Sequence, residues 1–482
     1  MKKIIPFVLL CVLTICTFVG LVGCEKKYEI REGQTLVVFR YDGAEGKQDE
    51  ETFYIPHDET FSLPTDLKKE GYGFVGWKHN GLSVRDNWES GQNDMLVFEA
   101  IFEKDYKDLN ATCAVWDNKS SDYVDYPEGE YDNINVKVTD VVVKAGYKAT
   151  FYSKRGFSGK RADVVCYKGY LNRRVHSLKV EKIVSDEETF DHALTDDDLA
   201  YLLKEYAPKI WWDKNERYFA STVEEAFKNF VRVPSGDGYY YNLDAVGSDA
   251  YFGSGENCAC SFVYGDKNGG KIYAFAVKKE YVYLDLCYYI FEPFNYGKDI
   301  LGKPYGNHIG DWEHVSVGMK LDESETRTVV KPLFMETSYH AWRDYTPYDA
   351  LEKEGKHPVA YIACKSHGTW PSAGTHVYKN AVVLQLKDEC SQGTAWDTWN
   401  TIETYAYDAL TWTGRGVGES VWNPCFDKNV LDPDGTAVIH WGNKGLPDGV
   451  FYRHLETAPT GPEQKNSLYN YYAMNAPQTY EV

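Results

Sequence analysis

The sequence lacks the short signatures of the common nucleotide-dependent enzymes and serine hydrolases. It contains no Gly-x-Ser-x-Gly nucleophile elbow, no phosphate-binding loop and no dinucleotide-binding glycine motif. Basic residues are also scarce, since 52 Lys and Arg stand against 72 Asp and Glu, a formal net charge of −20. Because this charge repels a phosphate backbone, we expect no general nucleic-acid binding.

The composition that is present indicates a folded, β-rich protein. Of the 482 residues, 43% are hydrophobic, and the mean hydropathy is −0.49. These values exclude a disordered chain and a polytopic membrane protein. The length exceeds what one hydrophobic core usually organises, so several domains are expected. Aromatic residues reach 15%, with 39 Tyr and 13 Trp, and such rings suit strands and wet binding surfaces. We therefore expect a mainly β, multidomain, extracellular protein.

The first 23 residues have the parts of an export signal. Two lysines precede an apolar run over residues 4–22, and small residues precede Cys24. The run approaches membrane-spanning length, so an uncleaved anchor is the alternative. Residues 21–24 resemble a bacterial lipobox, which implies cleavage after residue 23 and lipidation of Cys24. The residues that follow are charged and have no periodicity, so residues 24–33 are expected to be a tether. We expect a lipid-anchored, extracytoplasmic protein at the cell membrane.

The expected extracytoplasmic location determines which state of the cysteines is expected. Of the 11 cysteines, Cys11 and Cys16 leave with the signal and Cys24 carries lipid, so eight remain, an even number that favours disulfides. Cys113 and Cys166 fall in one predicted domain, and we expect them to pair. The other six leave their connectivity open: Cys258, Cys260, Cys287, Cys364, Cys390 and Cys425. The first two could suggest a metal clip, but without a second closely spaced pair a thiolate zinc site is the weaker interpretation.

Residues 34–104 are predicted to form a small β domain. The run Gly-Tyr-Gly-Phe-Val-Gly-Trp at 71–77 precedes an apolar strand at 96–102. Glycines permit tight turns there, and the aromatic rings can fill a small core. The pattern resembles the internalin-type B repeat of bacterial surface proteins, which implies a spacer or adhesion module without catalysis.

Residues 107–186 read as two related β motifs, each with an aromatic corner and a closing strand. They resemble the βγ-crystallin fold, which implies a Greek-key domain. Two positions that supply calcium ligands in that family are Val136 and Arg173 here. Because calcium requires oxygen ligands and is repelled by arginine, we expect a rigid spacer that does not bind calcium.

Residues 187–482 are predicted to form a larger β-sandwich with short flanking helices. Thr195 and the following aspartates begin a helix with apolar residues at helical spacing, and Ser221 with Glu224 begins a second one. After residue 255, apolar strands alternate with turns rich in Gly, Pro, Asn and Asp.

The densest polar cluster reads Gly-Asn-His-Ile-Gly-Asp-Trp-Glu-His at 306–314. On an extended chain, Asp311 and Glu313 project from the same face, and His308 lies in a glycine-flanked loop before them. Two carboxylates and an imidazole suit a divalent cation: magnesium, calcium or manganese. Spacing alone supports equally well a polar strand end with a surface carboxylate pair.

This cluster also carries a family resemblance. Together with His-Pro-Val-Ala-Tyr-Ile-Ala at 357–363 and Ser-His at 366–367, it resembles the vacuolar protein sorting-associated protein 62 family between residues 206 and 462. The family name reflects a sorting phenotype, so the resemblance implies a fold and not a reaction.

A second resemblance bears on the metal. Necrosis-inducing proteins of plant pathogens carry Gly-His-x-His-Asp-Trp-Glu, with a divalent cation on the first His, the Asp and the Glu. In this sequence the motif selects His308, Asp311 and Glu313, and Gly310 replaces the second His. Those proteins bind a glycosylated membrane lipid. We therefore expect a divalent cation in the sandwich, with water or a fourth side chain, Asn295 or Asp299, completing its coordination shell. The expected extracellular partner is a glycan, a glycolipid or a surface protein.

A metal-dependent hydrolase is the alternative. A cation can activate water, and an imidazole can act as general base. His367, in a glycine-containing turn after a predicted strand, is the first candidate base, and His314 is the second. The absence of a recognisable nucleophile favours ligand binding.

Overall fold

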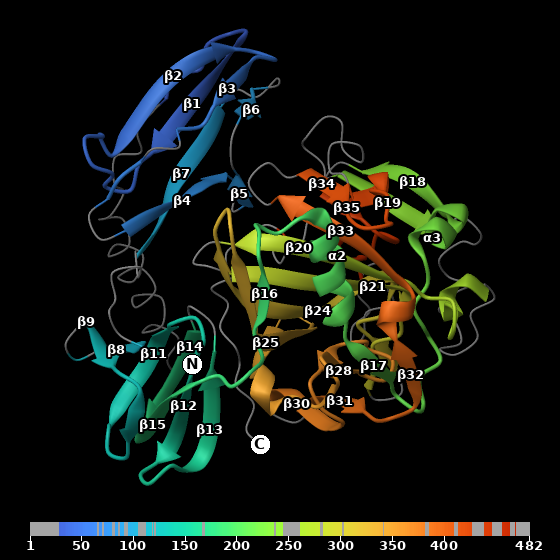
Figure 1. The fold of residues 1–482 in the computed structure, drawn as a ribbon. Helices are drawn as coiled ribbons and strands as arrows, with labels where there is room; N and C mark the ends of the chain where they lie inside the picture. The colour runs from blue at the N-terminus through green and yellow to red at the C-terminus, as the bar shows by residue number, and fades with distance from the viewer. Residues whose placement is uncertain are drawn as a thin grey trace, which may run out of the picture. The chain divides into compact units, whose positions relative to one another are not determined.

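The computed structural model describes residues 28–468 apart from the segments 65–66, 70–71, 80–81, 85–86, 91–94, 105–111, 118, 120–121, 166–168, 236–237, 244–260, 280–282, 301–302, 341, 381–384, 409–412, 427–437, 446–455 and 463–467. The chain divides into two compact units, residues 1–106 and 107–482. Both consist mainly of strands, which confirms the predicted mainly β, multidomain fold (Figure 1). Among the residues so described, no helix is long and apolar enough to cross a bilayer. Cys24 and the expected signal lie outside them.

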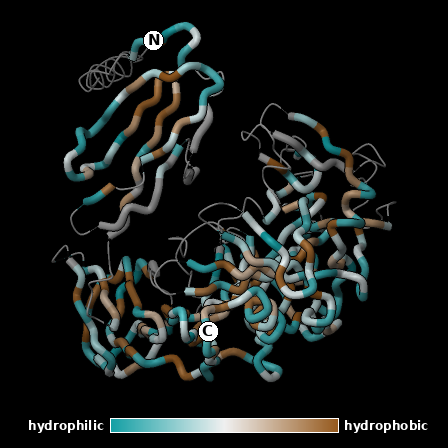
Figure 2. Tube along the Cα trace, turned by 45° about the horizontal axis from the view of Figure 1, so that its top comes forward, coloured by the Kyte–Doolittle hydropathy of each residue, from teal (hydrophilic) through white to brown (hydrophobic). Residues whose placement is uncertain are grey.

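The first unit is a small sheet domain. Its main sheet has the strand order β2 (Glu50–Pro56), β1 (Gln34–Arg40), β7 (Met95–Lys104), β4 (Tyr72–His79), β5 (Leu82–Val84), and β3 (Thr60–Ser62) pairs with β6 (Asn87–Glu89). The hydrophobic stretches of the trace follow strands of the sheet (Figure 2). Phe39 packs against Trp77 and Phe98, with ring centroids 4.7 and 5.7 Å away. The predicted aromatic core is therefore present, and the assignment to an internalin-type repeat stays a prediction.

The second unit begins with a pair of four-stranded sheets. One has the order β10 (Gly129–Tyr131), β15 (Ser177–Lys182), β12 (Tyr147–Lys154), β13 (Ser158–Val164); the other has β14 (Gly169–Val175), β11 (Val136–Val143), β8 (Cys113–Asp117), β9 (Asp122–Tyr126). Each sheet thus takes one strand from the other half of the segment. The two sheets enclose one apolar core that includes Val141, Phe151 and Leu178. The resemblance to crystallins stays a prediction.

The predicted disulfide involves one residue of this core. Cys113 is fully buried at the start of β8, and burial raises the pKa of its thiol well above the usual value. Cys166 lies outside the described residues, and no disulfide occurs within them. The pairing therefore stays a prediction.

The two-sheet domain packs on the large domain that follows it. Val165 and Ile183 contact Leu333, Phe334 and Tyr345 in one apolar cluster. A salt bridge of 2.8 Å between Lys148 and Asp349 lies beside this contact. The first domain of this unit is thus joined to the large domain by packing as well as by the chain.

The large domain is a β-sandwich, as predicted. Its main sheet has the order β16 (Glu188–Phe190), β25 (Thr328–Tyr339), β24 (His308–Glu323), β21 (Tyr283–Asn295), β20 (Ile272–Lys279), β33 (Ile402–Asp408), β34 (Thr413–Gly416), with β26 (Trp342–Pro347) on β25. The second sheet has the order β27 (Lys353–Glu354), β28 (His357–Ile362), β17 (Lys209–Trp212), β32 (Thr394–Asp397), with β29 (Thr369–Trp370) on β28. Further pairs are β18 (Phe230–Ser235), β19 (Gly238–Leu243) and β35 (Val438–His440); β22 (Lys298–Ile300) and β23 (Lys303–Tyr305); and β30 (Gly374–Asn380) and β31 (Gln385–Cys390).

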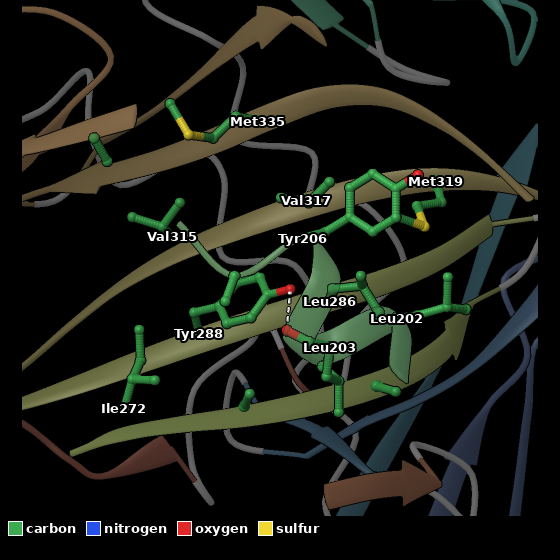
Figure 3. Close-up of a cluster of buried hydrophobic side chains, with 14 of the residues drawn as sticks. Leu202, Leu203, Tyr206, Ile272, Leu286, Tyr288, Val315, Val317, Met319 and Met335 are labelled. Carbon is green, nitrogen blue, oxygen red and sulfur yellow. Dashed lines mark hydrogen bonds between the residues drawn. The ribbon is translucent and has the colours of Figure 1, made fainter. Parts of the chain in front are cut away.

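The main sheet is buried on both faces. Leu286, Val315 and Val317 on its inner face pack against the second sheet and α2 (Asp196–Glu205) (Figure 3). Side chains alternate along a strand, so Phe291 and Trp312 lie on the outer face, in an aromatic cluster. Every residue of β21 is consequently buried, and a charged side chain on this strand lies in the protein interior.

The start of α2 offers a local test of the fold. Thr195 accepts a hydrogen bond from the Asp198 N–H, and the Asp198 carboxylate accepts one from the Thr195 N–H, which is the predicted capping box. We expect Thr195→Ala to lower the free energy of unfolding by about 1 kcal/mol. Asp197→Ala, in the same turn, should cost less. Urea denaturation measures both, and equal losses would contradict a specific cap.

Candidate metal centre

Three acidic side chains and one histidine lie buried where the main sheet meets two loops of the second sheet. Glu292 on β21 is directly opposite Asp311 on β24 in the antiparallel register. His367 follows β28, and Glu216 follows β17. β17 and β28 are parallel neighbours, so the loops after them begin at the same end of the sheet. Strand pairing thus collects residues that are far apart in the sequence.

Three of these side chains are placed like metal ligands. One ligand atom from each of Glu292, Asp311 and His367 lies within 4.8 Å of the other two. His367 Nδ1 is 3.7 Å from Asp311 Oδ2, and its Nε2 is 3.9 Å from Glu216 Oε2. These distances exceed a hydrogen bond, whereas ligands of one shared cation lie roughly 3 to 4.5 Å apart. The spacing fits a common ion.

The centre also contains buried polar atoms that have no hydrogen-bond partner in the described part of the chain. His367 and Glu292 are both 0% exposed. Both ring nitrogens of His367 and both carboxylate oxygens of Glu292 have no hydrogen-bond partner among the described residues. Buried polar groups are nearly always paired, and each failure costs about 1–3 kcal/mol. Four such atoms close together are what is expected of side chains that coordinate a bound cation.

The charge balance leads to the same interpretation. Burial raises the pKa of Glu292 well above its usual value, and the nearby carboxylates of Asp311, Glu313 and Glu216 raise it further. Glu216 is stabilised by backbone N–H donors, including that of Tyr218 at 2.9 Å. Glu292 therefore needs a proton or a cation to be neutralised, and a divalent cation would neutralise its neighbours as well.

The structure does not bring His308 of the predicted triad into this group. His308 Nδ1 lies 2.7 Å from the Gly310 carbonyl and therefore carries the proton. Its Nε2, 3.0 Å from Asn295 Nδ2, accepts a hydrogen bond. Both ring nitrogens are thus engaged within the protein. The imidazole that faces Asp311 is that of His367.

The other expected ligands are distributed between the centre and its surroundings. Asp311 belongs to the buried group. Glu313 lies beside it, 9% exposed, where it accepts a hydrogen bond of 2.9 Å from Ser338. Asn295 donates to His308, and Asp299 forms a salt bridge of 3.0 Å with Lys365. Neither of the two expected fourth ligands belongs to the group.

The two predicted general bases lie on opposite faces of the main sheet. His314 is on the outer face, stacked on Tyr289 with a centroid distance of 5.1 Å and 3.1 Å from Glu336. His367 is on the inner side. His314 therefore points away from Asp311 and His367, because consecutive strand positions alternate between faces.

Gly310 explains why this sequence departs from the motif of the necrosis-inducing proteins. Its φ is 67°, and a Cβ atom there would lie 1.6 Å from the carbonyl oxygen of Trp441. A histidine could not occupy this position without displacing the backbone.

The family model described as vacuolar protein sorting-associated protein 62 matches residues 153–422, which include every residue of the centre. Vacuolar protein sorting-associated protein 62 of Saccharomyces cerevisiae is 29% identical over 167 residues, 31% of this chain and 32% of the relative. A second yeast protein, named "Putative vacuolar protein sorting-associated protein TDA6", is 27% identical over 244 residues, 46% of this chain and 48% of the relative.

The chain thus spans about half or less of the length of these curated relatives. A solved structure titled "Toxin fold for microbial attack and plant defense" aligns with 13% identity and a TM-score of 0.24, over 44% of this chain and 77% of that one. A likeness at this level has no bearing on fold or function. The family model, in contrast, covers more than half of the 482 residues, and the chain belongs to the vacuolar protein sorting-associated protein 62 family.

Proposed function

We propose that this protein is a lipid-anchored, extracytoplasmic protein whose C-terminal sandwich holds one divalent cation and binds an extracellular ligand. The cation is magnesium, calcium or manganese, and its ligands are Glu292, Asp311 and His367. The observation that carries the proposal is the meeting of these three buried side chains within 4.8 Å. Cys24 is the proposed lipid attachment site, and a glycan, a glycolipid or a surface protein is the proposed partner.

The chemistry of the ligands favours a hard cation. Two carboxylates and one imidazole, with Glu216 close by, offer mainly oxygen atoms. A cation would offset the repulsion that raises the pKa of Glu292. Among the residues that the structure describes, no cysteine belongs to the group, which argues against a thiolate zinc site.

The burial of the centre supports binding over hydrolysis. A catalytic metal keeps an open coordination position for water or substrate, whereas His367 is 0% exposed. As a metal ligand, His367 is also not available as a general base. The proposed cation links β21 and β24 of the main sheet to a loop of the second sheet. It would thus hold the loops at this end of the sandwich in the arrangement that recognises the ligand.

Chelation tests the link between the cation and the fold. A cation present at a hundred times its Kd stabilises the folded state by about 2.7 kcal/mol, which corresponds to a Tm shift of about 4 °C for a domain of this size. We expect EDTA to lower the Tm of the full chain by this amount and excess Mn²⁺ to restore it. A Tm that does not respond to either addition would contradict the proposal.

A binding screen tests the role of the cation. Glycan arrays and vesicles containing glycolipids should retain the cation-loaded full chain and release it after chelation. The Glu292→Gln variant should behave like the chelated parent. Binding that is equal with and without the cation would separate ligand recognition from the metal centre.

A further inference from the structure

The loop that presents His367 has an unusual backbone. Lys365 has a φ of 69° and His367 a φ of 56°, values in the left-handed region that few residues other than glycine adopt. A loop with two such residues persists only where surrounding contacts fix it. The contacts that fix this loop therefore also determine where the imidazole points.

The buried carboxylate of Asp388 on β31 accepts hydrogen bonds from residues before and after His367 in the sequence. Asp388 Oδ1 accepts a hydrogen bond of 2.7 Å from Ser366 Oγ, and Oδ2 accepts one of 3.0 Å from Trp370 Nε1. The side chain of Asp388 is 0% exposed. It also lies close to the loop backbone, since a Cβ atom on Gly368 would be 3.0 Å from Asp388 Oδ2.

Lys298 completes this cluster. Its ammonium pairs with Asp388 Oδ1 and donates a hydrogen bond of 2.7 Å to Ser366 Oγ. His340 Nε2 lies 3.4 Å from Asp388 Oδ2. Burial alone would raise the pKa of Asp388, but the interaction with His340 and the charge of Lys298 bring it well below the usual value. Asp388 is therefore a fully ionised anchor with several partners.

We propose that Asp388 is a positioning residue of the metal centre. It holds the segment from Ser366 to Trp370 so that the His367 ring faces Glu292 and Asp311, and it thereby sets the affinity for the cation. This inference rests on the proposed function. Groups that orient a metal ligand from behind typically change metal affinity by about 10- to 100-fold when they are replaced.

The test measures Mn²⁺ affinity of the full chain by isothermal titration calorimetry, at a temperature well below unfolding. We expect Asp388→Asn to weaken Mn²⁺ binding by about 10- to 100-fold. Ser366→Ala removes the hydrogen bond from the loop to Asp388 but leaves Lys298 and Trp370 in place, and should weaken binding in the same direction. The double variant should lose less than the sum of the two effects, because both act through one contact.

Glu336→Gln is the matched control. Glu336 is also a buried carboxylate, with 3% side-chain exposure, in an ion cluster with His314 and Arg343 on the outer face of the sheet. This variant should lower the Tm and leave Mn²⁺ affinity unchanged, which separates positioning from general stability.

Three results would overturn the inference. Asp388→Asn and Ser366→Ala proteins that bind Mn²⁺ like the parent would leave the metal centre intact and remove the positioning role. Equal weakening by Glu336→Gln would make the effect one of stability. A parent chain that binds no Mn²⁺ would overturn the proposed function together with this inference. If Asp388→Asn does not fold, Ser366→Ala alone decides the question.

Discussion

Replacing His367 with alanine should abolish measurable cation binding by the full chain, a loss of at least about 100-fold in Mn²⁺ affinity. A cation site held by three protein ligands loses its one nitrogen ligand in this variant, and Glu292 and Asp311 are left facing one another across the register of β21 and β24. Repulsion between the two carboxylates then favours a shared proton over a bound metal. Calorimetric titration with Mn²⁺ measures the loss.

His308→Ala is the control for this experiment, because it discriminates between the two imidazoles near Asp311. The His308 ring is engaged by Asn295 and Gly310, so its removal should change Mn²⁺ affinity by less than about threefold. If His308→Ala abolished binding while His367→Ala preserved it, the triad suggested by the sequence motif would be right and the centre assigned from the structure would be wrong.

The second large effect is expected on the outer face of the main sheet. Glu336 lies 3.1 Å from His314 Nε2 and 3.2 Å from Arg343 Nη1. Glu336→Ala leaves Arg343, whose side chain is 20% exposed, without this partner. Breaking a fully buried pair typically costs about 3–5 kcal/mol, so we expect a loss of about 2–3 kcal/mol here. Urea denaturation of the full chain should show this loss. Glu354→Gln, which removes the charge of an exposed partner of Lys209, should cost less than about 1 kcal/mol.

The same cluster predicts a dependence of stability on pH. Burial alone would raise the pKa of Glu336, but Arg343 and His314 lower it from 4.5 to about 2. Because the pKa is depressed in the folded state, the stabilisation is present above pH 4.5 and is lost as the pH falls towards 2, an effect on the order of 3 kcal/mol. In Glu336→Gln this part of the acid sensitivity should be absent. If the parent and Glu336→Gln lost the same free energy of unfolding between pH 5 and pH 2, the ion cluster would be contradicted.

The fold could be predicted from local patterns to a large extent. Alternating apolar residues and turn signals indicated a mainly β chain, and the capping box at Thr195 gave the start of α2. The second helix, α3 (Val223–Asn229), was misplaced by one residue, because Thr222 and not Ser221 caps it. The Ser221 N–H donates to the Phe291 carbonyl of the main sheet, which keeps Ser221 outside the helix.

The centre could be predicted only in part, because it depends on strand pairing. Asp311 belongs to a recognisable motif. Glu292 becomes its neighbour only through the register of two strands, although a charged residue within the apolar strand β21 was a usable signal. Glu216 reaches the site because β17 and β28 are parallel, which no local pattern reveals. His367 was expected to act as a base in a glycine-containing turn, whereas long-range packing buries it completely.

Elemental analysis of the purified full chain tests the central claim most directly. The protein is dialysed against a mixture of Mg²⁺, Ca²⁺ and Mn²⁺, freed of unbound ions and measured by inductively coupled plasma mass spectrometry. The metal centre predicts about one divalent cation per chain in the parent and in His308→Ala, and almost none in Glu292→Gln or His367→Ala. A folded parent that retains no divalent cation, or a His367→Ala variant that retains as much as the parent, would contradict the assignment.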